Sequence, residues 1–153
     1  MNDSGCPYVV VGGLAAVLHG VSRLTHDVDL VVELRTESAR QVIDALDRIG
    51  YQPQVPVRAR DFANADQRRA WIRDKGMQVF SLWDPDHVLP TVDLFVQYPI
   101  DFDELLAASD LVELGEYSVR IASTRHLIEM KKKAGRSHDL EDIRALQRLQ
   151  EKP

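Results

Sequence analysis

Two aspartates near the start of the sequence have the spacing of a metal-binding pair. Asp27 and Asp29 lie two positions apart in the predicted strand Asp27–Leu34, so both carboxylates leave the same face of the strand. Two carboxylates on one face repel each other, and a divalent cation would relieve that repulsion. Proteins hold Mg²⁺ with one or two carboxylates together with substrate phosphates. The pair therefore predicts a Mg²⁺ site that works on a phosphate compound.

A double glycine precedes this pair. Gly12 and Gly13 lie between the β-branched run Tyr8–Val11 and the apolar helical segment Leu14–Leu18, which places them at a strand-to-helix turn. Glycine there lets a ligand approach backbone amides at the positive end of a helix, and this arrangement suits a phosphate. The same residues could form only a tight turn, and the glycines by themselves do not decide between the two interpretations.

A third carboxylate, Asp93, lies in the predicted strand Thr91–Gln97. A lone pair such as Asp27 and Asp29 is often solvated on an edge strand. The apolar neighbours of all three aspartates favour central strands instead, where an uncompensated carboxylate is costly. This argument favours a functional role for the three carboxylates.

The elements that must position these residues are strands separated by helices. Amphipathic spacing predicts a helix over Glu37–Ile49, a polar helix over Asp61–Lys75 and a pair of helices over about 123–150, while Pro53 and Pro56 make 51–57 a loop or an edge strand. We therefore expect an α/β (α+β) fold, with a mixed sheet flanked by helices and a C-terminal helical pair. The predicted organisation is one domain over 1–153, with its core at about 8–121.

Three arginines on the predicted helix Asp61–Lys75 have two interpretations. Arg68, Arg69 and Arg73 form either a solvated helix face or part of the lining of an acceptor site, and the sequence favours neither. The histidines lack the spacing of metal ligands, so we assign them no chemistry.

Composition limits the classes of protein that the sequence can encode. The chain has 153 residues, 44% hydrophobic and 28% charged, which fits one globular domain. Its 19 Lys and Arg against 24 Asp and Glu give a net charge of -5, so the surface as a whole is not one for polyanions. Cys6 is the single cysteine, and no apolar run is long enough to cross a bilayer. We expect a soluble cytoplasmic protein without membrane association.

The ordered pattern resembles a known superfamily. The segment GGLAAVLHGVSRLTHDVD, followed by a later strand aspartate, is similar to nucleotidyltransferases of the DNA polymerase beta type. The C-terminal string MKKKAGRSHDLEDIRAL also resembles the Lys-x4-Arg motif and following aspartate of the minimal and AbiEii-type toxin nucleotidyltransferases. Many relatives have Ser where this chain has Gly13, so backbone amides would have to replace a hydroxyl.

The resemblance implies a role for each matched residue. The catalytic and metal-binding residues would be Asp27, Asp29 and Asp93. The nucleotide and phosphate contacts would be Gly12, Gly13, Arg23, Thr25, Lys131 and Arg136. The supporting residues, which would orient Lys131 or Arg136, are Asp139 and Asp142.

The implied activity is an enzyme with two bound Mg²⁺ ions. It would transfer a nucleoside monophosphate from a nucleoside triphosphate such as ATP to a hydroxyl of RNA (for example tRNA), a protein or a small molecule, and release pyrophosphate. Two alternatives remain open. One is a non-catalytic nucleotide-sensing module of a toxin-antitoxin-like system with an antitoxin-like protein partner, and the other is a metal-dependent phosphodiesterase that uses water as the acceptor.

Overall fold

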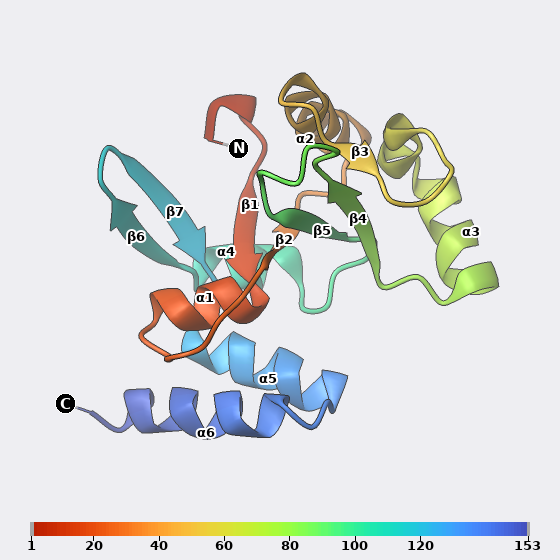
Figure 1. The fold of residues 1–153 in the computed structure, drawn as a ribbon. Helices are drawn as coiled ribbons and strands as arrows, with labels where there is room; N and C mark the ends of the chain where they lie inside the picture. The colour runs from red at the N-terminus through yellow and green to blue at the C-terminus, as the bar shows by residue number, and fades with distance from the viewer. Residues whose placement is uncertain (1, 153) are drawn as a thin grey trace.

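The structure is a computed structural model and describes residues 2–152. Figure 1 shows its helices (α), 3-10 helices (η) and strands (β). In chain order they are η1 (Asn2–Ser4), β1 (Tyr8–Val11), α1 (Gly12–Leu18), β2 (Asp27–Val32), α2 (Thr36–Arg48), β3 (Gln52–Pro53), η2 (Ala59–Ala63), α3 (Ala65–Lys75), β4 (Val79–Trp83), β5 (Thr91–Phe95), α4 (Phe102–Ala107), β6 (Asp110–Leu114), β7 (Tyr117–Ile121), α5 (Thr124–Ala134) and α6 (Asp139–Gln150).

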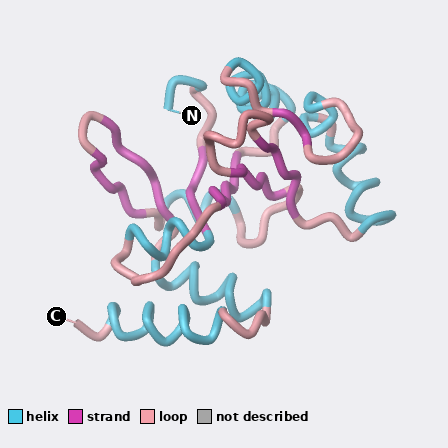
Figure 2. The backbone as a smooth tube through the Cα atoms, in the orientation of Figure 1, coloured by secondary structure: helices cyan, strands magenta, loops and turns pink. Residues whose placement is uncertain are grey.

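The strands form one mixed seven-stranded sheet in the order β3-β4-β5-β2-β1-β7-β6. Strand β2 occupies the centre, where it pairs antiparallel with β1 and parallel with β5. Helices α5 and α6 lie side by side below one end of the sheet (Figures 1 and 2). This arrangement confirms the predicted mixed α/β class with a C-terminal helical pair.

The two faces of the sheet differ in cover. On one face, the ring of Phe80 in β4 stacks on Phe62 of η2 and on Trp71 of α3, with centroids 5.6 and 5.2 Å apart. The residues of β4 and β5 that point to this face are buried, whereas those that point to the opposite face are only half-buried. The half-buried face is the one that carries Asp93.

The expected edge position of the proline-containing segment 51–57 is confirmed, because β3 is a two-residue strand at one edge of the sheet. Among residues 2–152, no helix has both the length and the apolar content needed to cross a bilayer.

The predicted continuous helix over Asp61–Lys75 is wrong at its start. Asn64 has an extended backbone, with φ −85° and ψ 116°, and it separates η2 from α3. Its side-chain oxygen accepts a hydrogen bond from the backbone N–H of Gln67, so Asn64 caps the new helix. A local cap of this kind outweighs the helical pattern on either side of it.

The three arginines of this region do not act as one group. Arg68 is buried, and its guanidinium donates to the backbone carbonyls of Phe62 and Leu34 at 2.5 and 3.0 Å. Arg69 and Arg73 instead form ion pairs with aspartates of their own helix, with their side chains 69% and 72% exposed. Arg68 thus belongs to the packing of α3 and not to a solvated face.

Candidate active site

The three aspartates lie on two neighbouring strands at the centre of the sheet. The parallel register of β2 and β5 pairs Asp29 with Asp93 and Asp27 with Thr91. Paired residues on adjacent strands point to the same face, with the strands about 4.8 Å apart. The carboxylates of Asp29 and Asp93 are therefore neighbours, and Asp27 is exposed at the beginning of β2.

The electrostatics of this group shows an excess of negative charge. The pKa of the Asp29 carboxyl is raised to about 6, chiefly by burial and then by the charges of Asp93 and Asp27, while Arg136 acts in the opposite direction. Burial also raises the pKa of Asp93, against the hydrogen bond that it accepts from Ser81. An added cation would stabilise the ionised form of both groups.

Sequence reasoning did not find Ser81. The antiparallel register of β4 and β5 places it opposite Asp93, and its hydroxyl donates to Oδ1 of that carboxylate. Only the pairing between β4 and β5 brings the hydroxyl to the aspartate, and the sequence of either strand does not specify that pairing.

The donor atoms of this group fit Mg²⁺, which prefers carboxylate oxygens and phosphates. Within residues 2–152, no three His, Cys, Asp or Glu side chains are already arranged as a group that could hold a metal ion. Mg²⁺ keeps several waters and takes further ligands from substrate phosphates, so one or two protein carboxylates are sufficient. Burial and then the repulsion by Asp93 and Asp27 raise the pKa of Asp29, and a bound cation would offset both effects.

The glycine turn packs directly against the first of these carboxylates. Gly12 has φ +66°, and a Cβ atom on it would lie 2.1 Å from Oδ2 of Asp29. The backbone N–H of Gly13 hydrogen-bonds the Asp29 carboxylate and lowers its pKa in part. A Cβ on Gly13 would lie 2.8 Å from Oγ1 of Thr25 and 3.5 Å from Cζ of Arg23. Both positions therefore need glycine for the close approach of the protein's own groups.

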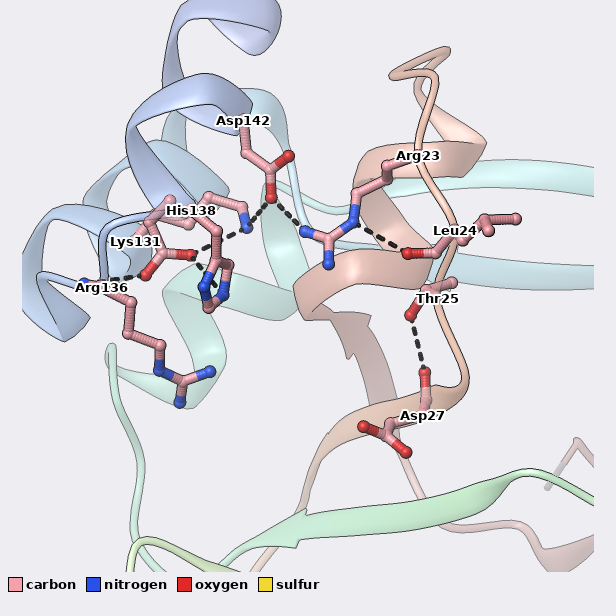
Figure 3. Close-up of polar contacts among 9 residues, drawn as sticks. Arg23, Leu24, Thr25, Asp27, Lys131, Arg136, His138 and Asp142 are labelled. Atoms are coloured by element: carbon pink, nitrogen blue, oxygen red, sulfur yellow. Dashed lines mark hydrogen bonds and ion pairs between the residues drawn. The ribbon is translucent and has the colours of Figure 1, made fainter.

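A buried group of charges connects the C-terminal helices with this turn (Figure 3). The ammonium of Lys131 in α5 lies 2.7 Å from Oδ2 of Asp142 and 3.4 Å from Oδ1 of Asp139, both in α6. Asp142 also accepts a hydrogen bond from Arg23, in the loop that precedes β2. Burial alone would raise the pKa of Asp142, but the hydrogen bonds and positive charges of Lys131 and Arg23 lower it.

Lys131 and Arg136 are in different surroundings. The Lys131 side chain is 9% exposed and lies between two carboxylates. Arg136 is exposed, and its side chain extends away from the Lys131–Asp142 pair, although its backbone N–H donates to Asp139 at 3.2 Å (Figure 3). Its charge lowers the pKa of both Asp29 and Asp93. Arg136 is thus the C-terminal cation that acts on the strand carboxylates.

Removal of the Asp142 carboxylate should destabilise the protein strongly. We expect Asp142→Ala to lower the free energy of unfolding by about 3 kcal/mol or more, because it leaves the buried Lys131 with one partner fewer and Arg23 without its carboxylate. Urea denaturation at pH 7 measures the change. The matched control is Glu141→Ala, which removes an exposed acid from the same helical turn and should cost less than about 1 kcal/mol.

The effect should also depend on pH. Since the pKa of Asp142 is lowered on folding, its stabilisation is present above the unfolded value of about 3.9 and is lost as the pH falls through the lower folded value. An equal loss of stability in the Asp142→Ala and Glu141→Ala proteins at pH 7 would contradict the assignment.

The chain resembles known proteins in its structure but not in its sequence. No protein-family model matches the sequence, and no curated protein matches it either. Among solved structures, the chain is similar to the lincosamide antibiotic adenylyltransferase LnuA in its lincomycin-bound form, at 15% identity and a TM-score of 0.62 over 97% of this chain and 90% of LnuA. It is also similar to an antigenic nucleotidyltransferase-like protein from Paracoccidioides brasiliensis, at 17% identity and a TM-score of 0.58 over 95% of this chain and 69% of the other. The chain therefore shares its fold with these two solved structures.

Proposed function

We propose that this protein is a Mg²⁺-dependent nucleotidyltransferase, which transfers a nucleoside monophosphate from a nucleoside triphosphate to a hydroxyl group. The observation that carries the proposal is the in-register pair Asp29 and Asp93 on parallel central strands, with Asp27 two residues before Asp29 on β2 and the Gly12 turn packed on Asp29. Central strands seldom carry carboxylates unless these are used, because burying them is costly.

The chemistry assigns separate tasks to the three aspartates. Asp27 and Asp29 would hold the metal, and Asp93 would share it and accept the proton of the attacking hydroxyl. Bound Mg²⁺ would polarise the α-phosphate and stabilise the charge that develops on the leaving group. The acceptor oxygen forms a bond to the α-phosphorus, the bond from that phosphorus to the bridging oxygen breaks, and pyrophosphate leaves. The Ser81 hydroxyl keeps Asp93 in position through its hydrogen bond.

The phosphates would lie on the side of the C-terminal helices. Arg136 is exposed and acts on the aspartates, and Arg23 lies against the glycine turn, so these two guanidiniums are the contacts that we propose for the triphosphate. Thr25 lies beside Gly13, where its hydroxyl could reach the same phosphates. Lys131 would act from behind this group, since it holds the carboxylate that orients Arg23.

Calorimetric binding of the four nucleoside triphosphates, with and without Mg²⁺, tests the proposal. We expect Mg²⁺-dependent binding to the wild type and its loss in the Asp27→Asn/Asp29→Asn double variant. The matched control is Asp47→Asn, an exposed aspartate on α2, which should bind as the wild type does. Equal binding by the double variant and the wild type would contradict the metal assignment.

Product analysis with a triphosphate labelled at the α-phosphate then identifies the reaction. Transfer leaves the label on an acceptor and releases unlabelled pyrophosphate. Label found only in free nucleoside monophosphate would show hydrolysis, with water as the acceptor, and would contradict the proposed transfer.

A further inference from the structure

We propose that the free edge of strand β6 is a docking site for an extended, basic segment of another protein, which adds antiparallel to β6 as a further strand of the sheet. In the order of the sheet, β1 and β7 separate this edge from the strand aspartates of β2. The proposal therefore concerns a second surface and does not depend on nucleotidyl transfer.

Strand β6 is the longer of the two edge strands. The opposite edge, β3, has two residues and contains Pro53, whereas β6 runs for five residues, Asp110–Leu114. All five pair with β7 in one continuous register. Figure 1 shows the β6–β7 hairpin projecting from the rest of the sheet, with β6 on its outer side. Proline, lysine and bulges are among the devices that protect an edge strand from pairing, and β6 contains none of these three.

The backbone of β6 presents hydrogen-bonding groups to this free edge. Leu114 and Tyr117 flank the two-residue turn, whose first residue, Gly115, has φ +64°. The residues that flank such a turn are hydrogen-bonded to each other, and the hydrogen-bonded positions alternate along the strand from there. The N–H and C=O groups of Leu111 and Glu113 therefore point away from β7. An added strand can pair with these two donors and two acceptors.

The side chains of the hairpin divide into two faces. Leu114, Tyr117 and Val112 share one face, where Leu114 and Tyr117 are 45% and 68% exposed. Leu111 and Glu113 lie on the other face, and Leu111 is 55% exposed. A strand with apolar side chains on the first face would cover Leu114 and place its alternate side chains beside Glu113.

The charge of the hairpin selects the kind of partner. Residues 110–121 contain three acids, Asp110, Glu113 and Glu116, against one cation, Arg120. Within the described part of the chain, neither Glu113 nor Glu116 forms an ion pair. Opposite charges that face each other across neighbouring strands stabilise the pairing, and like charges oppose it. A segment with Lys or Arg opposite the acids of β6 therefore complements this edge.

A second copy of the same strand fits the edge less well. Antiparallel pairing of β6 with itself about Val112 would set each of its acids, Asp110 and Glu113, against a leucine. It would also bring two acidic hairpins together. A basic strand instead places a cation opposite each acid and an apolar side chain opposite Val112.

The test is an NMR titration of the isotopically labelled full chain with the blocked peptide Thr-Val-Lys-Val-Thr-Lys-Thr. In antiparallel register, its lysines lie opposite Glu113 and Asp110, and its first valine lies opposite Leu114. Binding should shift the amide signals of Leu111 and Glu113 and slow their hydrogen exchange, because these N–H groups become hydrogen-bonded. The amide of Val112 points to β7 and should change little.

Two altered peptides are the first controls. Proline in place of the threonine that faces Leu111 keeps the charge of the peptide but removes a backbone donor, so it should weaken binding about fivefold. Glutamate in place of both lysines should abolish binding, because the acids of the hairpin then meet like charges.

Matched variants of the protein separate the contribution of the backbone from that of the side chains. Leu111→Pro removes an N–H that β7 does not use, so the hairpin should be retained and binding should weaken about fivefold. Its control, Leu111→Thr, also loses the leucine but keeps the N–H, and it should bind nearly as the wild type does. Glu113→Lys should also weaken binding about fivefold, whereas Glu37→Lys, the same change of charge at an exposed position of α2, should not.

Four results would each overturn the inference. The first is no binding of the basic peptide. The second is binding that shifts signals without slower exchange at Leu111 and Glu113, which would show attraction by charge alone. The third is equal binding by Leu111→Pro and Leu111→Thr. The fourth is a dimer of the wild-type chain in sedimentation that Leu111→Pro abolishes, since the edge would then belong to a second copy of this chain.

Discussion

Replacement of Asp29 by Asn should reduce nucleotidyl transfer by about 1,000-fold and leave the fold intact. The substitution keeps the volume of the side chain but removes one negative charge from the pair with Asp93, and with it a proposed metal ligand. The loss corresponds to about 4 kcal/mol of transition-state stabilisation. A single-turnover transfer assay at saturating triphosphate and Mg²⁺ measures it.

The same variant should make the metal-free protein more stable at neutral pH. The pKa of Asp29 is raised to about 6 on folding from the ordinary value of 3.8, so the ionised carboxylate destabilises the folded state by about 3 kcal/mol. Because the folded state binds the proton more tightly, this destabilisation is absent below about pH 4, grows as the pH rises, and is complete above about pH 6. Thermal unfolding of wild type and Asp29→Asn between pH 4 and 8 in EDTA should therefore give curves that separate towards higher pH.

Asp47→Asn serves as the control for both experiments, because Asp47 is exposed on α2 and belongs to no part of the proposed site. An Asp29→Asn protein that transfers at the wild-type rate would remove Asp29 from the metal site. One that is less stable than wild type at pH 8 would show that the carboxylate is stabilised by its surroundings, contrary to the raised pKa.

Replacement of Gly12 by Ala should also reduce activity, by about 100-fold, for a steric reason. The new Cβ would lie 2.1 Å from Oδ2 of Asp29, so the carboxylate or the turn must move. Displacement of a catalytic group by about 1 Å can reduce the rate 100-fold. The steric clash and the strain of a side-chain-bearing residue at φ +66° should together lower the free energy of unfolding by about 3 kcal/mol.

A second glycine separates strain from the steric clash. Gly115, in the β6–β7 turn, has φ +64° but nothing within 4 Å of an added Cβ, so Gly115→Ala should cost only about 1 kcal/mol and retain activity. In an Asp29→Ala protein, adding Gly12→Ala should lower the free energy of unfolding by only about 1 kcal/mol, because the clashing carboxylate is gone. If Gly12→Ala costs the same with and without Asp29, the turn does not press on that carboxylate.

Much of the fold could be predicted because its signals are local. The alternation in 27–34 and 91–97 identified two strands, and apolar flanks indicated that Asp29 and Asp93 lie in the sheet interior, where the structure places them in register. The sequence pattern misplaces an element boundary where a side chain competes with it. Asn64 is the example, since it follows the end of η2 and its side chain caps the start of α3.

The missed features depend on contacts between distant parts of the chain. Ser81 meets Asp93 only through the register of two strands, which the alternation within either strand does not specify. The contact between Arg23 and Asp142 joins residues 119 positions apart. Arg68 was assigned to an exposed or acceptor-lining face because its helix is polar, but carbonyl acceptors from two other segments allow it to be buried.

The contact between Arg23 and Asp142 joins an early and a late part of the chain during synthesis. On the ribosome, the glycine turn and Arg23 are synthesised first, and α6, with the carboxylate that holds Arg23, is made more than a hundred residues later. A growing chain that lacks α6 leaves Arg23 without this partner, so the contact forms only after α6 has been synthesised. Proteolytic loss of α6 from the finished protein would return the turn to the same unsupported state, although every strand aspartate would still be present.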